Sequence, residues 1–391
     1  MRQRFAGEAP YAIGLLIGAT LLVWSGYLDR SAGVVRGNDF AGFWAGARAI
    51  VEGYDPFRVA DWPALAEALG GQRPDTPVYG YPGWVAVALV PFGLMPLATA
   101  SALWTFGGLA IAAAAVRMLL RMAIPELPIV HTLVGVTLLA SQSARTAVIL
   151  GQWTFILVAA LSVAAMLAGR RPVAAGLGAI ALLAKPHLFL LAYPALIFHA
   201  FRLGRGWLYA TALLIGALAL IAASLIVLPG WPSMWLSVVP GHRLLDPPQT
   251  TTIPALLSGL LGPAGGVLTA VIGGICLVVA ALFRPGSRTG LGIWISLSLI
   301  VAPYQWSYDH LLLLPAIVLV ASGIEAASRR RAVLTASTAC SILLVLGTLL
   351  AAQAASSGTE TLAAVTPALT LAVLVIGAWP LRDRVPRLGG A

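Results

Sequence analysis

The 391-residue sequence carries few charged side chains, which make up 10% of it. Soluble domains carry about 25% charged residues, so an ordinary soluble domain is excluded. The sequence also has only two cysteines, Cys276 and Cys340, and both lie inside apolar runs. It therefore predicts no disulfide framework.

Short motifs of several enzyme and pump classes are missing too. The sequence contains no Asp-x-Asp pair, so it offers no candidate for a metal-held nucleotide-sugar site. It lacks the Gly-x-x-x-x-Gly-Lys-Ser/Thr motif, which argues against an ATP-driven pump. It has neither a Cys/His cluster at metal-ligand spacing nor a Gly-x-Ser-x-Gly nucleophile elbow. We expect no metal and no cofactor.

Apolar residues make up 59% of the chain, and its mean hydropathy is +0.91. Several runs approach or exceed the ~20 apolar residues that cross a bilayer as a helix. These runs are far too long for barrel strands, so the sequence predicts an all-α polytopic membrane protein with one domain over residues 1–391. The first run, 11–28, is too long for a typical signal-peptide core, and no clear cleavage site follows it.

The basic residues are scattered between the apolar runs, although the net charge is +10. The positive-inside rule explains this pattern better than a nucleic-acid partner. Alternating spans and basic loops predict about 12 spans in the plasma membrane, with both termini cytoplasmic. Between the spans we expect a half-span helix at 81–94, a polar turn at 141–152 and an outer loop at 229–252.

The longest polar stretch, residues 29–80, follows the first span and is predicted to lie outside. Asn38 or Asp39 can cap a helix there, and apolar residues follow at three- and four-residue spacing. Gly53 and Pro56 then end the helix. We expect a short amphipathic helix on the membrane surface, which fixes the Asp39 carboxylate at the mouth of the first span.

Unusual polar residues gather on the predicted outer face, where ionisable groups at membrane depth usually mark a function. Asp39 can act as a general base toward a hydroxyl, cations can neutralise a leaving phosphate, and aromatic rings suit the faces of a sugar. The candidate donor-phosphate contacts are Lys185, His310, Arg145 and Arg243, and the candidate substrate contacts are Trp44, Tyr81, Gln152, Trp306 and Tyr308. Together these residues predict sugar transfer from a lipid phosphate.

Each of these residues also has a simpler interpretation. Asp39 can be only a helix cap, and the two roles are compatible. Lys185, the one lysine of the chain, can extend along the lipid to the interface. Gln152 and Arg145 can satisfy backbone groups at a turn, and the aromatic residues can form an interfacial belt. His310 can be an ordinary polar residue at a span entrance.

Several motifs, taken in this order, resemble glycosyltransferase family 87. Asp39 follows the first span, and the later matches are Phe43-Trp44-x-x-x-Arg48, Gly53-Tyr54-Asp55-Pro56-Phe57, Tyr81-Pro82, Gly151-Gln152, Lys185-Pro186 and Trp306-x-x-x-His310. The resemblance covers roughly residues 24–320. The sequence departs from the family at Gly83, where a second proline is common, and at Asp309, where a second histidine is common.

The resemblance implies a C-type (GT-C) fold: a multi-span enzyme that uses polyprenyl-phosphate sugars, often mannose, outside the cytoplasmic membrane. It implies Asp39 as the base, with His310 and Lys185 near the donor phosphate. The expected reaction is one in-line displacement, in which a β-linked donor gives an α-linked product. Arabinose or another pentose is an alternative to mannose, and the acceptor is a glycolipid or glycan.

Two other functions compete with this prediction. A transporter or flippase should show an internal repeat and ionisable residues near the middle of the membrane. No clear repeat is visible, and the polar residues gather at one face instead. The second competitor, a non-catalytic assembly factor, should tolerate substitution of Asp39.

Overall fold

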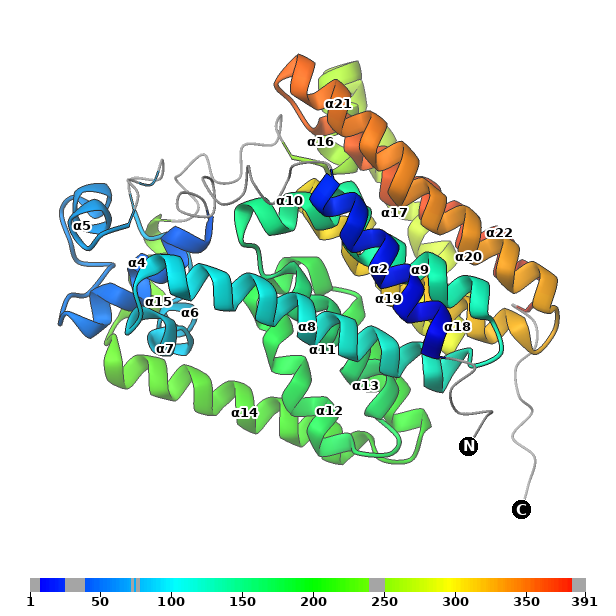
Figure 1. Ribbon diagram of the computed structural model, residues 1–391, viewed down its shortest axis with the longest axis horizontal. Coiled ribbons are helices and arrows are strands. Elements are labelled where there is room, and N and C mark those ends of the chain that lie inside the picture. The colour runs from blue at the N-terminus through cyan, green and yellow to red at the C-terminus, as the bar shows by residue number, and fades with distance from the viewer. Residues whose placement is uncertain (1–7, 25–38, 72–73, 75–77, 239–249, 382–391) are drawn as a thin grey trace.

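The computed structural model describes residues 8–24, 39–71, 74, 78–238 and 250–381, and within these ranges the chain forms helices and no strand (Figure 1). The helices of the first half are α2 (Glu8–Trp24), α4 (Asp39–Val51), α5 (Trp62–Ala68), α6 (Gly83–Ala88), α7 (Val90–Gly93), α8 (Leu97–Ala123), α9 (Pro128–Ala140), α10 (Gln142–Leu150), α11 (Thr154–Leu167), α12 (Pro172–Ala179), η1 (Ile180–Ala184), η2 (Pro186–Phe189) and α13 (Ala192–Arg202). Those of the second half are α14 (Gly206–Val227), α15 (Trp231–Val238), α16 (Ile253–Leu261), α17 (Ala264–Leu282), α18 (Arg288–Ile300), η6 (Ser307–Leu312), α19 (Leu313–Glu325), α20 (Arg329–Ser341), the π-helical η7 (Ile342–Leu346), α21 (Gly347–Ser357), η8 (Thr361–Ala364), α22 (Val365–Ala378) and η9 (Trp379–Leu381).

Seven described segments are long and apolar enough to cross a membrane: Leu97–Ala123, Pro128–Leu150, Gly206–Val227, Ala264–Leu282, Ser307–Glu325, Arg329–Ala354 and Thr361–Leu381. Four shorter apolar helices accompany them: Ala9–Trp24, Thr154–Leu167, Pro172–Ala184 and Arg288–Ile300. These helices agree with the prediction of a polytopic helical membrane protein. They do not confirm the predicted number of 12 spans.

Burial separates the central helices from those at the edge. The apolar window of Ser307–Glu325 is 89% buried, so η6 and α19 lie at the centre of the bundle. The corresponding windows of α14 and α17 are only 11% buried, and side chains such as Trp207 and Ile226 are exposed. A helix that is apolar all round and has no protein cover suits contact with lipid.

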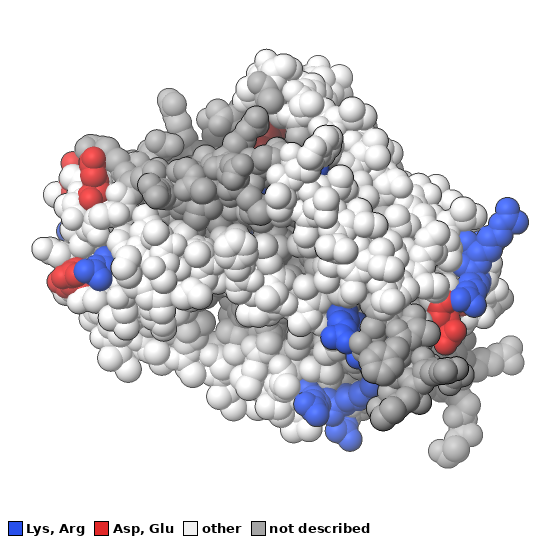
Figure 2. Space-filling view, viewed as in Figure 1, with Lys and Arg blue, Asp and Glu red and all other residues white. Residues whose placement is uncertain are grey.

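Lys and Arg side chains in the space-filling view gather mainly away from α4 to α7, on the other end of the molecule (Figure 2). The sequence places Arg117 and Arg121 near the end of α8, and three arginines begin α20. Much of the surface between the two ends carries no charged side chain in this view. This distribution matches the predicted alternation of apolar spans and basic loops.

The helix α4 begins and ends close to where the sequence predicts, and Gly53 follows it with a φ of +82°. Protein encloses this helix on several sides, because the buried residues Phe40, Ala45 and Gly46 point to different sides of it. Its expected place on the membrane surface stays a prediction. The helices α6, α7 and α8 pack against it. Small residues permit this close approach, since a Cβ on Gly93 would come within 2.9 Å of the Ala47 carbonyl oxygen. Apolar spacing alone does not distinguish a bilayer from a protein interior.

Two predicted connections contain helices. Most of the expected polar turn at 141–152 is α10, capped by Ser141, whose hydroxyl accepts a hydrogen bond from the Ala144 amide. The expected loop at 229–252 contains α15, where the indole of Trp235 donates to the Gly80 carbonyl over 3.0 Å. Residues 81–94 contain the two short helices α6 and α7, and the half-span expected there stays a prediction.

Candidate functional site

The Asp39 carboxylate lies at the start of α4 and meets a glutamine that follows α10. One carboxylate oxygen of Asp39 accepts a hydrogen bond from the side-chain amide of Gln152. Gln152 is only 5% exposed, and its other polar atom, Oε1, has no hydrogen-bond partner among the described residues. The contact places Gln152 as a positioning group for Asp39 and leaves one buried acceptor oxygen beside it.

Gly151 explains why Gln152 reaches Asp39. It ends α10 in the left-handed conformation, with a φ of 62°, and a Cβ at this position would lie 2.5 Å from Cβ of Phe40. The indole of Trp104 donates to the Gly151 carbonyl over 2.8 Å, and its ring stacks on Phe40 at 5.4 Å between centroids. Backbone shape, the indole hydrogen bond and ring packing thus hold the ends of α4 and α10 together.

Substitution of Gly151 by Ala should lower both stability and activity. A left-handed residue with a Cβ costs about 1–2 kcal/mol, and the Phe40 contact adds to that cost. We expect a loss of at least this size in the free energy of unfolding, measured by denaturant titration in detergent. Gly107→Ala on α8 is the matched control, because Gly107 has open space around it. Unchanged stability of Gly151→Ala would contradict this geometry.

Lys185 lies between η1 and η2, where the proline that follows it begins a new helical turn. Its ammonium lies 2.9 Å from Oδ1 of Asp309, and the two side chains are only 12% and 1% exposed. The same ammonium lies 4.3 Å from the ring centroid of Tyr308, in cation–π geometry. The other Asp309 oxygen accepts the Trp306 amide over 3.1 Å. This pair therefore fixes the cation within the core of the protein.

His310 belongs to η6 and is 2% exposed. Its Nε2 lies 3.3 Å from the hydroxyl oxygen of Thr251. Thr251 in turn exchanges backbone and side-chain hydrogen bonds with Gln305, including a 2.7 Å bond from the Gln305 amide to the Thr251 carbonyl. This network joins the chain before α16 to η6.

The electrostatic surroundings of Asp39 suit a general base. Burial raises the pKa of the Asp39 carboxyl, while the Lys185 charge and the Gln152 hydrogen bond lower it in part, and the Asp309 charge raises it. Burial also raises the pKa of Tyr304 to about 12, with a further contribution from Asp39 and Asp309. A carboxyl with a raised pKa accepts a proton more readily near neutral pH than an ordinary one does.

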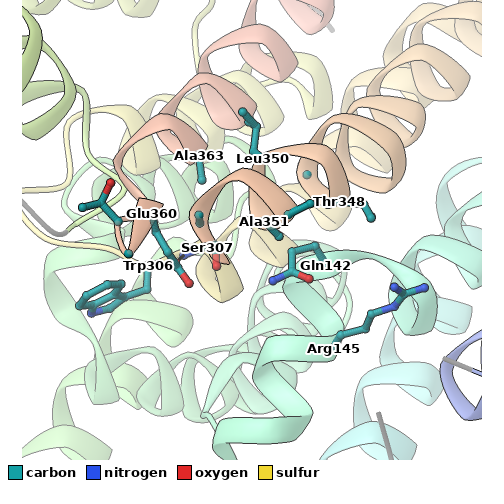
Figure 3. A pocket seen from close by; sticks show the side chains of 14 residues that line it. Gln142, Arg145, Trp306, Ser307, Thr348, Leu350, Ala351, Glu360 and Ala363 are labelled. Atoms are coloured by element: carbon teal, nitrogen blue, oxygen red, sulfur yellow. Dashed lines mark hydrogen bonds between the residues drawn. The ribbon is translucent and has the colours of Figure 1, made fainter. Parts of the chain in front are cut away.

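A cavity of about 670 Å³ adjoins this cluster and lies between α10, η6, α21 and η8 (Figure 3). Gln142 and Arg145 line it from α10, and Trp306 and Ser307 from the start of η6. Glu360 lines it from the chain before η8 and accepts the Ser307 amide over 3.3 Å. Trp306 joins cavity and cluster, because its backbone amide contacts Asp309.

The structure thus brings together most of the predicted site. The central cluster contains Asp39, Gln152, Lys185, Tyr308 and Tyr81. Burial and the Asp39 charge both raise the pKa of Tyr81. Trp306 and Arg145 line the adjoining cavity, and His310 lies next to Asp309 in the chain.

The structure places one predicted residue away from both the cluster and the cavity, in the packing of α4. Trp44 is buried and donates its indole N–H to the Met95 carbonyl over 3.0 Å, which makes it a packing residue of α4. Trp44 lies five residues along α4 from Asp39, and at 3.6 residues per turn this spacing turns it to another side of the helix. Aromatic character alone does not reveal that difference. Arg243 lies outside the described residues.

Sequence reasoning missed two acidic residues. From the sequence, Asp309 is noted as a departure from the family pattern and is given no role at the site. In the structure it forms an ion pair with Lys185. Glu360 follows a stretch of small residues and has no local motif. The described residues contain no group of three or more His, Cys, Asp or Glu side chains that could hold a metal ion.

The comparison with protein families decides the membership of this chain. The model of glycosyltransferase family 87 matches residues 79–303, which is more than half of the sequence. The chain belongs to glycosyltransferase family 87. No curated protein and no solved structure gives a significant match. The part of this family 87 protein that is matched contains Gln152 and Lys185, whereas Asp39, Trp306 and His310 lie outside it.

Proposed function

We propose that this family 87 glycosyltransferase transfers a sugar, mannose, from a polyprenyl-phosphate donor to a hydroxyl of a glycolipid or glycan, with inversion at the anomeric carbon. Family membership supplies the reaction class. The observation that carries the rest is the partly buried carboxylate of Asp39, held by Gln152 within the electrostatic field of Lys185. A base and a cation side by side fit a reaction in which a hydroxyl loses a proton and a phosphate gains charge.

The reaction is a single displacement. Asp39 takes the proton of the acceptor hydroxyl as the acceptor oxygen forms a bond to the anomeric carbon. The bond between that carbon and the phosphate oxygen breaks, and polyprenyl phosphate leaves with the electron pair. Lys185 stabilises the negative charge as it develops, and Asp309 and the Tyr308 ring keep the ammonium in position. Arg243 is the other cation proposed for the phosphate, whereas Arg145, which the sequence also offered for it, lines the adjoining cavity.

The helices around the site suit a donor with a lipid tail. The chain is broken between η1 and η2 at Lys185 and between α6 and α7 near Leu89. Irregular backbone at membrane depth is tolerated where it is buried in protein or lines a cavity. A tail can therefore stay in the bilayer while its phosphate enters between broken helices.

The charge distribution supports an external site. Lys and Arg side chains gather mainly at the end of the molecule away from α4 to α7 (Figure 2). By the positive-inside rule, that end faces the cytoplasm. The start of α4 and the Asp39 cluster then lie toward the outer face of the plasma membrane, and both termini lie inside.

A donor panel tests this function. The purified protein in liposomes is given a membrane glycolipid extract and one labelled donor at a time: polyprenyl-phosphate mannose, polyprenyl-phosphate arabinose or GDP-mannose. We expect label in the glycolipid fraction with polyprenyl-phosphate mannose and none with GDP-mannose. Transfer from GDP-mannose alone would overturn the proposed donor class, and transfer from the arabinose donor alone would overturn the proposed sugar.

The pH profile gives a further prediction. Because a base must be ionised, kcat/KM should rise with pH through the pKa of Asp39, which burial raises above its ordinary value. Gln152→Leu removes a hydrogen bond that lowers this pKa, so the rising limb should move to higher pH. Gln353→Leu on α21 is the control, with no expected shift. An unmoved limb in Gln152→Leu would contradict the contact.

A further inference from the structure

The cavity beside the central cluster has the size and the lining of a ligand site. Its volume of about 670 Å³ falls within the range of roughly 300–1,000 Å³ that is usual for small-molecule pockets. Asp39, Gln152 and Lys185 are not among the residues that line it. It is therefore a second compartment, next to the groups that the proposed reaction uses.

One lining group can form a hydrogen bond with a polar ligand. The Ser307 side chain lines the cavity and is 5% exposed, and its hydroxyl oxygen has no hydrogen-bond partner among the described residues. Burying a hydroxyl without a hydrogen-bond partner is unfavourable. A ligand that donates or accepts a hydrogen bond here would recover that cost.

The charged residues of the lining favour a neutral ligand over an anionic one. Arg145 and Glu360 are the charged residues that line the cavity, one of each sign. They lie on different sides of it, and Glu360 points toward Ser307 (Figure 3). A phosphate at this place would meet the Glu360 carboxylate, whereas sugar hydroxyls can donate to Glu360 and accept from Arg145.

The shape of the lining also fits a sugar ring. Trp306 provides an indole that is partly exposed at the edge of the cavity, and such a ring can cover the apolar face of a sugar. The helix α21 contributes small residues to the lining, among them Gly347 and Ala351. Small side chains leave room for a rigid ring at low entropic cost.

The cavity lies close to the residues of the proposed reaction. Arg145 lies on α10, and Gln152 follows the end of the same helix. Trp306 lines the cavity and contacts Asp309, the partner of Lys185. A ligand in the cavity thus lies close enough to be covalently joined to the residue that reacts at Asp39.

We propose that this cavity binds an uncharged sugar residue of the acceptor, next to the residue that receives the new sugar. This proposal rests on the proposed function and refines it: the acceptor is a molecule that already carries sugar, and Trp306, Glu360 and Ser307 select it. An acceptor hydroxyl without a neighbouring sugar should then be a poor substrate.

The test blocks the cavity with a larger side chain. Ala351→Leu places a bulkier group in it, and Glu360→Gln removes the carboxylate with little change of shape. Ala270→Leu, at an exposed position on α17 outside the cavity, is the matched control. Two quantities are measured for each purified full-length variant: acceptor KM in the transfer assay, and saturation-transfer NMR signals from methyl α-mannoside and an α-linked mannose disaccharide.

We expect Ala351→Leu and Glu360→Gln to raise the acceptor KM at least tenfold, to leave the donor KM unchanged and to lose the saturation-transfer signal. Wild type, Ala270→Leu and Asp39→Asn should keep that signal. Sugar binding that depends on Ala351 and Glu360 supports the site even if no transfer is found. A failure of the proposed function can therefore be told apart from a failure of the proposed sugar site. Unchanged binding and unchanged acceptor KM in both cavity variants would overturn the inference.

Discussion

Asp39→Asn should lower kcat for sugar transfer by about 10²–10⁴-fold, which is the usual contribution of a positioned general base. Asn has nearly the same size as Asp, and its carbonyl oxygen can still accept the hydrogen bond that Gln152 donates. It cannot take a proton from the acceptor hydroxyl. The expected loss is therefore in the chemical step, with little change in the KM of donor or acceptor.

The control for this result is another aspartate at the start of a helix. Asp61 caps α5 by accepting the Ala64 amide over 2.9 Å, and it lies outside the central cluster. Asn is as good an N-cap as Asp, so Asp61→Asn should keep wild-type transfer. Asp39→Asn should also keep its stability, because a buried carboxylate is costly. Wild-type kcat in a folded Asp39→Asn protein would remove Asp39 from the role of base.

The second large effect concerns the buried pair of Lys185 and Asp309. Removal of one partner from a buried ion pair typically costs about 3–5 kcal/mol, because the remaining charge is left without compensation. Lys185→Met leaves the Asp309 carboxylate, which is 1% exposed, with the Trp306 amide as its remaining hydrogen-bond donor among the described residues. We expect a loss of stability of about this size by denaturant titration in detergent, and loss of transfer.

The double variant separates structure from catalysis. Lys185→Met combined with Asp309→Asn removes both charges, so most of the lost stability should return. Transfer should stay low, because no cation then meets the leaving phosphate at this position. A double variant with wild-type kcat would show that the pair is only structural. Equal stability of the single and double variants would show that the two charges do not interact.

The sequence predicts the individual helices of this protein better than it predicts which other helices pack against them. Apolar runs and basic loops indicate where helices begin and end, and Gly53 stops α4 as expected. The same pattern does not show that α4 is enclosed, since its exposure depends on α6, α7 and α8, which come later in the chain. The polar segment after Ser141 is helical because its ends are capped by Ser141 and Gly151.

Single residues of the site were predictable where their chemistry is unusual for a membrane segment. Asp39 and Lys185 are such residues, and the structure places both in one cluster. Their direct partners, Gln152 for Asp39 and Asp309 for Lys185, lie 113 and 124 positions away along the chain. Pairing over such separations is set by helix packing. Glu360 was missed for the same reason, because the cavity forms only when η8 meets α10 and η6.

The most direct test of Asp39 as the base in sugar transfer uses a β-linked polyprenyl-phosphate mannose with ¹³C at its anomeric carbon. Purified wild type and Asp39→Asn are each incubated with this donor and the glycolipid extract, and the product is read by NMR at the labelled carbon. The predicted result is an α-linked product from wild type and no product above background from Asp39→Asn. A β-linked product, or equal product from both proteins, would contradict a single displacement with Asp39 as the base.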